Sequence, residues 1–392
     1  MNDHTKKTVI IVGTGATIGS GYLKCGNPLP GDKGFFGHAV VRKMVKEYPA
    51  LCIMLDFFNS HRDNCNYEMA SLEEVWTFLE FCSKGIYSKI YNFEKEKKKW
   101  IGWAWDLTNH PPDKHCLYDT YSNDFTIPPD SSKIDLFLIA GWELRALLSE
   151  IYRNCRLENG RNVYKNFMKA FEINKSEGTV FISLNYDTIL EKALNSIVKD
   201  SWHYSHIKTN VNRKEDGIQV LKPHGSFNWL MKGNPNFSIT TDYGLEPVQN
   251  RCHEVDKFEQ AAIIAPTQLK QEVNVNETQN PITTELFSKI WNSMAKALID
   301  AENVFIIGYS FPPTDYHLQW LFRVVNRQRK NRKYKKVYCC VKTDNDNELK
   351  TISSKTKLLL PAEEGNYDIW QNGFKQFRPK KKRNRNVSGL DL

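Results

Sequence analysis

Long apolar runs, a secretory signal and internal repeats are all missing from this sequence. No apolar run approaches the roughly 20 residues that span a bilayer, so we expect no membrane-embedded segment. The first seven residues lead directly into a short β-type run without a signal-peptide core or cleavage site, which favours the cytoplasm. No repeat of fixed period is visible, and the composition is that of an ordinary globular protein.

The cysteines form no disulfide framework either. They are odd in number and irregularly spaced, so we expect reduced and mostly buried thiols. Adjacent Cys339 and Cys340 fall within an apolar run, and no Cys-x-x-Cys pair occurs anywhere. The nine positions are 25, 52, 65, 82, 116, 155, 252, 339 and 340.

Basic residues outnumber acidic ones by 54 to 45, which gives a formal charge of +9 at neutral pH. Much of the excess is concentrated in three clusters, at residues 95–99, 327–336 and 378–385. Such clusters are usually solvated faces or mobile tails, so nucleic acid is a secondary hypothesis, mainly through the last cluster. No aromatic residue interleaves with that last cluster to stack on bases.

Short apolar runs rich in β-branched residues recur along the chain. The first, at residues 9–12, ends at a glycine-rich turn, as the first buried strand of a nucleotide-binding fold does. Helical patterns separate the runs, which predicts an α/β protein with a Rossmann-like, doubly wound, mostly parallel sheet. The further predicted strands are residues 51–55, 180–184, 218–221, 262–264, 304–307 and 337–341.

Helical periodicity is clearest after Ser71, where Ser71 and Glu74 form a capping-box pattern and apolar residues follow at helical spacing. Residues 134–152 and 286–301 carry similar apolar stripes, and the second stretch runs directly into a predicted strand. We predict one nucleotide-binding domain over residues 1–377 with a mostly helical insertion at about 57–160. The remaining residues, 378–392, form a basic tail that we expect to be disordered.

A glycine-rich loop follows the first predicted strand. In residues 13–21, Gly-Thr-Gly-Ala-Thr-Ile-Gly-Ser-Gly, bare backbone can approach a pyrophosphate and the next helix can present free N–H groups. The spacing departs from the dehydrogenase fingerprint, and tight packing alone is the alternative explanation. Asp56 is the one acidic candidate for a ribose contact, but it lies further along the chain than the roughly 20 residues after the glycine loop at which dehydrogenases place this residue. It is equally explained as a strand-end or capping residue. The residues of this loop expected to contact the nucleotide are Gly13, Gly15, Ala16, Thr17 and Gly19.

Two further motifs lie at predicted strand ends. Asn185 and Asp187 follow one strand, where open α/β sheets place ligand-contacting groups, and such a pair can bind a ribose and a water. The alternative is a turn in which both side chains cap the following helix. His224 follows the next strand beside Gly225. Its imidazole can take a proton near neutral pH, and a structural hydrogen-bonding role is the alternative.

A third loop follows the predicted strand at residues 304–307. Gly308, Tyr309 and Ser310 suit a close approach to phosphate or ribose oxygens, and Asp315 follows in the same loop. The alternative is a tight strand-to-helix turn in which Asp315 caps the helix. Because the carboxyl ends of parallel strands share one edge of a sheet, we expect all of these motifs to lie on the same rim.

Taken in order, the motifs resemble the sirtuin-like NAD-binding family, specifically its bacterial NAD-hydrolysing branch in antiphage defence. Residues 13–21 look like the first NAD loop, 184–187 like the asparagine motif, 222–225 like the histidine motif and 307–310 like the late ribose-and-phosphate loop. The resemblance implies that Asn185 positions a water or the nicotinamide ribose, and that His224 is a general base or contacts a ribose hydroxyl. The residues after Gly21 lack the family's Pro-Asp-Phe-Arg signature, which leaves the residues that cover the nicotinamide unidentified.

Protein-deacylating members of that family carry a zinc module with two Cys-x-x-Cys pairs, which this sequence lacks, so we expect no metal. The resemblance therefore implies an NAD+ glycohydrolase, with NAD+ as substrate, that acts in antiviral defence by NAD+ depletion. It also implies a cytoplasmic homo-oligomer that assembles with a HerA-type ATPase. The alternatives are an NAD- or ADP-ribose-binding sensor without catalysis, a protein deacylase or ADP-ribosyltransferase, and a nucleic-acid-binding module.

Overall fold

The main sheet is parallel, and its central strand is the first strand of the chain. The structure is a computed structural model that describes residues 7–60, 70–83, 136–160, 162–173, 178–199, 201–207, 217–233, 238–241, 245, 258–264, 281–313, 315–330, 332–364 and 366–377. Within those residues the sheet has seven strands in the order β13-β12-β11-β1-β5-β7-β6. The central strand β1 (Thr8–Val12) pairs in parallel with β5 (Thr179–Ser183) on one side and β11 (Asn303–Ile307) on the other. The outer strands are β6 (Trp202–Tyr204), β7 (Ile218–Leu221), β12 (Lys336–Cys340) and β13 (Tyr367–Trp370).

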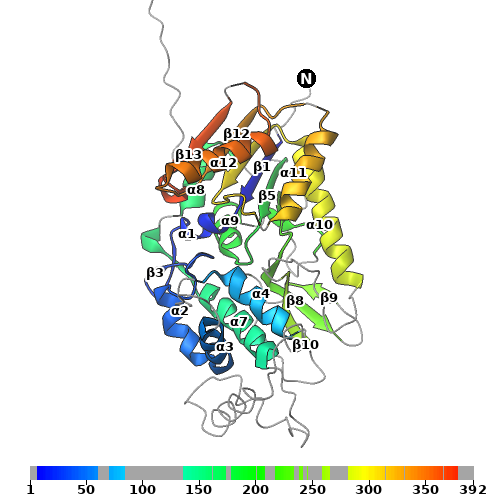
Figure 1. Ribbon diagram of the computed structural model, residues 1–392. Helices are drawn as coiled ribbons and strands as arrows, with labels where there is room; N and C mark the ends of the chain where they lie inside the picture. The colour runs from blue at the N-terminus through cyan, green and yellow to red at the C-terminus, as the bar shows by residue number, and fades with distance from the viewer. Residues whose placement is uncertain are drawn as a thin grey trace, which may run out of the picture.

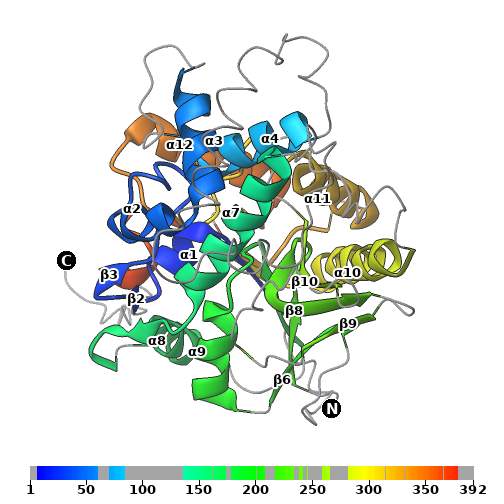
Figure 2. The same ribbon diagram turned by 90° about the horizontal axis from the view of Figure 1, so that it is seen from below.

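The chain winds outward from β1 in both directions, as predicted for a doubly wound α/β fold. It first builds β5, β6 and β7 on one side and then returns past β1 to add β11, β12 and β13 on the other. Because parallel crossovers are right-handed, the two halves place their helices on opposite faces of the sheet (Figures 1 and 2). One face carries α8 (Val163–Ala170) and α9 (Ile189–Val198). The other carries α10 (Pro281–Asp300), α11 (Tyr316–Gln328) and α12 (Asp346–Leu359).

Burial on both faces explains why the central strands are continuous apolar runs. All four residues from Val9 to Val12 are completely shielded from solvent. The five runs predicted as strands at residues 9–12, 180–184, 218–221, 304–307 and 337–341 are confirmed to within a residue or two at each end. The edge strands β6 and β13 were missed because His203 and Asp368 interrupt their short apolar patterns.

The predicted strand at residues 51–55 is wrong, because this run lies inside helix α3 (Pro49–Ser60). Its buried side chains include Leu51, Leu55 and Phe58, which follow helical spacing. A short apolar run cannot be assigned to a strand or a helix from its composition alone, and the proline at the first helical position was the missed signal. Asp56 therefore lies within a helix rather than at a strand end.

The run at residues 262–264 is extended but belongs to a different sheet. It forms the end of β10 (Phe258–Ile263), which pairs antiparallel with β8 (Gly225–Gly233). The opposite edge of β8 pairs with β9 (Ser238–Thr240). This small sheet follows directly from β7, so the chain leaves the main sheet at Gly225.

A group of helices lies beyond the carboxyl ends of the main strands (Figure 1). Helices α3 and α4 (Leu72–Ser83) both pack on α7 (Leu136–Tyr152), and α2 (Ala39–Met44) lies beside them. The predicted cap of α4 is confirmed, since the Glu74 N–H donates to the Ser71 hydroxyl over 3.0 Å. Residues 84–135 and the tail at 378–392 lie outside the described residues, so the predicted domain boundaries stay a prediction.

Short elements complete the described chain. A small antiparallel sheet joins β2 to its two neighbours next to the first loop. No helix within the described ranges is both long enough and apolar enough to cross a bilayer. The remaining elements are α1 (Thr14–Ile18), β2 (Tyr22–Lys24), β3 (Asn27–Pro28) and β4 (Arg156–Leu157), with single 3-10 turns at Val45–Glu47, Glu158–Gly160 and Phe374–Gln376.

Candidate functional site

The predicted site residues lie in the segments that directly follow four neighbouring strands. These strands are β11, β1, β5 and β7, which are consecutive in the sheet. Because all of them are parallel, the loops meet at one edge, beneath the sheet in Figure 1 and around α1 in Figure 2. The winding reverses between β1 and β11, and open α/β sheets bind ligands at such a reversal. The expectation of a common rim is confirmed.

The glycine-rich loop packs tightly on the loop after β11. A Cβ atom on Gly13 would lie 2.7 Å from the Gly308 carbonyl oxygen, and one on Gly15 would lie 2.8 Å from the Gly308 Cα. Gly308 has a φ of +67°, and a Cβ there would meet the Ala16 nitrogen at 2.0 Å. The three glycines are thus required by loop packing, which was the alternative explanation for the motif. A role in binding phosphate stays a prediction.

The N–H groups of this loop already have partners in the protein. Gly13 donates to Ile307 over 2.9 Å, Gly15 donates to Gly308 over 3.0 Å, and Ala16 donates back to Gly13 over 2.8 Å. The helix that follows, α1, has only five residues. The expectation that the helix after β1 presents free N–H groups is therefore wrong for Gly15 and Ala16. The bonds of Gly13 and Gly15 fasten this segment to the end of β11, and the bond of Ala16 closes the turn within the segment.

A buried polar chain joins the first loop to the loop after β5. The Asn185 amide nitrogen donates to the Gly13 carbonyl over 3.0 Å and to the Thr17 hydroxyl over 2.9 Å. Thr17 donates in turn to the Asp187 carboxylate over 2.7 Å. Because a carbonyl can only accept, the contact with Gly13 fixes which end of the amide is nitrogen. The side-chain oxygen of Asn185 is then the atom that can accept a hydrogen bond from a ligand.

Asp187 combines a capping role with a tertiary one. One carboxylate oxygen accepts from the Ile189 N–H over 2.9 Å at the start of α9, and the other accepts from Thr17. The predicted cap is thus confirmed for Asp187, whereas Asn185 bonds to a different loop. Burial raises the pKa of Asp187 above its usual value, and the nearby Lys222 ammonium opposes that shift.

His224 lies where the chain passes from the main sheet to the small sheet. Its Nδ1 lies 3.2 Å from the Leu184 carbonyl oxygen, immediately before Asn185. A carbonyl accepts only, so this hydrogen bond requires the proton on Nδ1 and makes Nε2 the basic nitrogen of the neutral ring. Gly225, with a φ of +82°, makes the turn, and a Cβ there would lie 2.0 Å from the Ala262 oxygen.

Two aromatic rings from different parts of the chain lie near His224. The Tyr186 ring lies 6.1 Å from the imidazole, and its hydroxyl donates to the Ile264 carbonyl over 2.7 Å. The Trp291 ring of α10 lies 6.4 Å from the imidazole, and His317 of α11 lies 6.5 Å from Trp291. The site therefore has a wall of planar side chains from α10 and α11 beside the rim.

A buried ion pair beneath the site was not anticipated. Lys222 and Glu191 are both fully buried and lie 2.9 Å apart, and Lys222 also donates to the Asp187 carbonyl. Tyr204 donates to the same Glu191 oxygen over 3.0 Å. Lys222 belongs to the histidine motif, but nothing in the sequence distinguishes Glu191 from other acidic residues in the first turn of a helix. Only the tertiary structure pairs them.

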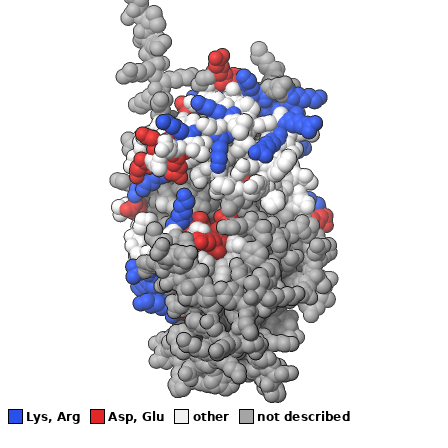
Figure 3. All heavy atoms as spheres, viewed as in Figure 1, with Lys and Arg blue, Asp and Glu red and all other residues white. Residues whose placement is uncertain are grey.

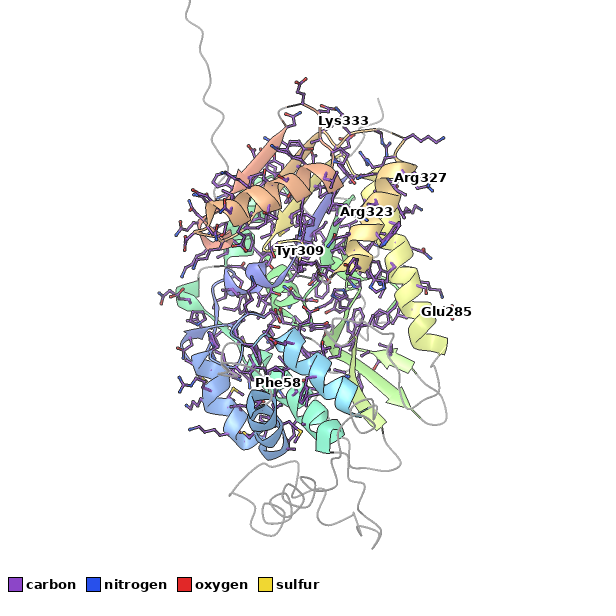
Figure 4. All side chains as sticks on the ribbon, viewed as in Figure 1. Phe58, Glu285, Tyr309, Arg323, Arg327 and Lys333 are labelled. Carbon is purple, nitrogen blue, oxygen red and sulfur yellow. The ribbon has the colours of Figure 1, made fainter. Side chains whose placement is uncertain are left out.

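The late loop supplies a buried phenol. Tyr309, which is labelled in Figure 4, is almost completely buried. Its ring packs edge-on against Phe311 at 5.0 Å, and burial raises its pKa. No described residue hydrogen-bonds to its hydroxyl. Ser310 is exposed, and Asp315 is buried at the N-cap position of α11 without making the capping hydrogen bond. The alternative in which the Asp315 side chain caps this helix is therefore wrong, and the predicted nucleotide contact stays a prediction.

Comparison with known proteins finds a similarity to one domain family over part of the chain. Residues 179–359, just under half of the sequence, match the family described as the SIR2-like domain. That segment runs from β5 to the end of α12, so it includes Asn185, His224 and the late loop but not the first glycine loop. A comparison with curated proteins finds no match.

Two solved structures of sirtuins are similar to the chain at low scores. One was solved to explain sirtuin substrate affinity; it shares 12% identity at a TM-score of 0.32, over 94% of this chain and 90% of its own. The other is Sir2 in complex with the inhibitor EX-527, 2′-O-acetyl-ADP-ribose and a deacetylated p53 peptide. It shares 12% identity at a TM-score of 0.28, over 58% of this chain and 82% of its own.

Proposed function

We propose that this protein is an NAD+ glycohydrolase that cleaves the nicotinamide–ribose bond and releases nicotinamide and ADP-ribose. The observation that carries the proposal is the closeness of Asn185 and His224 on neighbouring segments of the rim. The imidazole of His224 bonds to the carbonyl of Leu184, the residue before Asn185. The SIR2-like match over residues 179–359 supports NAD+ as the substrate. Three hydrogen bonds among Gly13, Thr17, Asn185 and Asp187 hold the asparagine in a fixed orientation.

The proposed chemistry needs an oriented water and a base. When the bond breaks, its electron pair leaves with nicotinamide and the ribose carbon develops oxocarbenium character. In the proposal the Asn185 side-chain oxygen accepts a hydrogen bond from the attacking water, and His224 Nε2 takes the proton as the new C–O bond forms. Both groups are held before the substrate arrives, so little reorganisation is needed at the moment of reaction.

The test is release of nicotinamide from NAD+ by the purified full chain, measured by liquid chromatography. Replacing Asn185 or His224 by alanine should lower the rate at least about 100-fold, because a positioned base typically contributes that much. The matched controls are Asn27→Ala and His206→Ala, which remove exposed residues of the same types and should keep the wild-type rate. Thermal melting of each variant checks that the fold persists. Full activity in both site variants would exclude the proposed catalytic pair.

An NAD- or ADP-ribose-binding sensor without catalysis is the second candidate. The specific observation in its favour is that the first loop and Asn185 already use their polar groups to hold the loops together. A ligand that binds only the folded state raises its melting temperature. A rise with NAD+ that is accompanied by no nicotinamide release would support the sensor and overturn the hydrolase.

We further propose that NAD+ depletion is the antiphage output of this protein and that it works as a homo-oligomer with a HerA-type ATPase. The resemblance of the four motifs to the defence branch supports this proposal. Infected cells that express the wild-type chain should lose NAD+, whereas cells with the His224→Ala variant should retain it. Light scattering of the purified chain, alone and mixed with the ATPase, measures the assembly.

A further inference from the structure

Helix α11 presents aromatic residues to solvent on one face. The side chains of Tyr316, Trp320 and Val324 are 66%, 59% and 47% exposed and follow one another at intervals of four residues. The opposite face is buried and packs Leu318, Phe322 and Val325 into the core. Packing of α11 onto the sheet therefore does not explain the exposed rings.

Two arginines share that exposed face. At about 100° per residue, Tyr316, Trp320, Arg323 and Arg327 fall within an arc of roughly 60°. The Arg323 guanidinium lies 5.7 Å from the centre of the Trp320 ring. Figure 4 shows Arg323 and Arg327 on the outer side of the helix, and Figure 3 shows the same region covered by basic side chains. We call these four residues with Val324 the α11 face.

The charge of the α11 face has one sign. No Asp or Glu occurs from residue 316 to residue 335. Acidic residues at the ends of α10 are already engaged by lysines: Glu285 lies 2.5 Å from Lys289, and Asp300 lies 3.1 Å from Lys7. Glu302 likewise lies 3.0 Å from Lys335.

The basic cluster at residues 327–336 divides into two kinds of residue. Arg329 is buried, and its guanidinium donates to the carbonyl groups of Leu298, Ile299 and Ala301 at the end of α10. Its role is structural. Arg327 in the last turn of α11 is exposed, and the exposed Lys330 and Lys333 extend the positive surface beyond the end of the helix.

We propose that the α11 face binds single-stranded nucleic acid. Exposed aromatic rings offer stacking surfaces for unpaired bases, and neighbouring cations contact the backbone phosphates. Residues four apart on a helix have Cβ atoms about 5–6 Å apart, so Arg323 and Arg327 can reach successive phosphates. A symmetric contact with a second copy is disfavoured, because it would bring these arginines against their counterparts without a compensating acid.

The experiment measures fluorescence anisotropy of labelled 20-nucleotide single strands, as DNA and as RNA, with the full-length protein over a series of salt concentrations. Trp320→Ala should weaken binding about tenfold, as the loss of one stacked base does. Arg323→Glu with Arg327→Glu should weaken it further and lower the salt slope by about 1.4, since two phosphate contacts are lost. These positions are exposed, so folding should be unaffected, and circular dichroism confirms it.

Matched controls distinguish binding at the α11 face from non-specific electrostatic attraction between this basic protein and nucleic acid. Lys43→Glu in α2 with Lys46→Glu in the 3-10 turn that follows makes the same charge change at exposed positions, and Leu358→Ala removes an exposed apolar side chain from α12. Both should keep the wild-type affinity. Binding that equals wild type in the α11 variants, or no binding by the wild type, would overturn the proposal. Complete competition by polyglutamate at equal charge would overturn it in favour of an acidic protein partner. None of these outcomes depends on NAD+ cleavage.

Discussion

Gly308 is the residue at which the two loops of the switch point meet. Its φ of +67° is unfavourable for other residues, and a Cβ would lie 2.0 Å from the Ala16 nitrogen. Gly26 has a similar φ of +79°, but no atom of the described residues lies within 4 Å of its Cβ position. A comparison of substitutions at Gly308 and Gly26 therefore separates the cost of backbone strain from the cost of a steric clash.

We predict that Gly308→Ala lowers the free energy of unfolding by more than about 3 kcal/mol, whereas Gly26→Ala lowers it by only about 1 kcal/mol. Both variants carry the cost of a left-handed residue, and only the first must also push β1 and β11 apart. Urea denaturation measures both values. Equal losses would mean that the loops accommodate a methyl group and that the glycine contact is not essential.

The buried Lys222–Glu191 pair makes a second prediction at the scale of residues. Lys222→Met leaves the Glu191 carboxylate in the core without its cation, and breaking one partner of a buried pair costs about 3–5 kcal/mol. Adding Glu191→Gln to this variant should recover part of the loss, because the uncompensated charge is removed. Denaturant unfolding of the two single variants and the double variant gives the coupling energy.

The exposed pair Lys7–Asp300 is the matched control. Its side chains are 55% and 36% exposed, so Lys7→Met should cost less than about 1 kcal/mol. A loss of similar size for Lys7→Met and Lys222→Met would show that burial does not govern these pairs. Since Lys222 also donates to the Asp187 carbonyl, its loss should loosen the turn that carries Asn185.

At the scale of elements, helix α3 depends on a carboxylate from α7. The Leu51 N–H donates to Glu143 over 2.6 Å, and Glu143 is almost completely buried. Burial raises the pKa of Glu143 to about 8, although backbone hydrogen bonds from α3 oppose the shift. Because the folded pKa exceeds the unfolded one, the stabilising contribution is complete below about pH 4.5 and is lost as the pH rises through 8.

We predict that Glu143→Gln removes this dependence on pH. The amide oxygen of glutamine still accepts from Leu51, but the side chain never becomes charged. Thermal melting between pH 5 and 9 should show the variant gaining stability relative to wild type, by up to about 1.4 kcal/mol for each unit of the pKa difference. Glu47→Gln, at an exposed position, should follow the wild type. Parallel curves for Glu143→Gln and wild type would contradict the raised pKa.

At the scale of the whole molecule, the sheet should open from its edges. Strands β1, β5 and β11 each have a partner on both sides, whereas β6 and β13 end the sheet within the described residues. We predict that amides of β1 exchange with solvent only on global unfolding and that those of β6 and β13 exchange much faster. Hydrogen exchange followed by mass spectrometry tests this order. Equal protection across the sheet would indicate that the whole domain opens as a single unit.

The local pattern of the sequence determined the fold class and the composition of the rim. Completely buried strands need continuous apolar runs, and turns after them need glycine or short polar residues, so both are visible without coordinates. These rules correctly put Asn185, His224 and Gly308 on one edge. The same rules failed at residues 51–55, because a short apolar run serves a buried helix as well as a buried strand.

Only the tertiary structure decided what the polar groups of the site bind. It uses the first glycines to pack β1 against β11, turns the Asn185 nitrogen toward Gly13, and pairs Lys222 with Glu191. Each contact joins residues that are distant in the chain. The type of a residue fixes the number of its hydrogen-bond donors and acceptors, but it does not determine which residue it bonds to. The sequence therefore indicated which polar residues gather at the rim, and the packing of the loops determined which of their atoms bond within the protein.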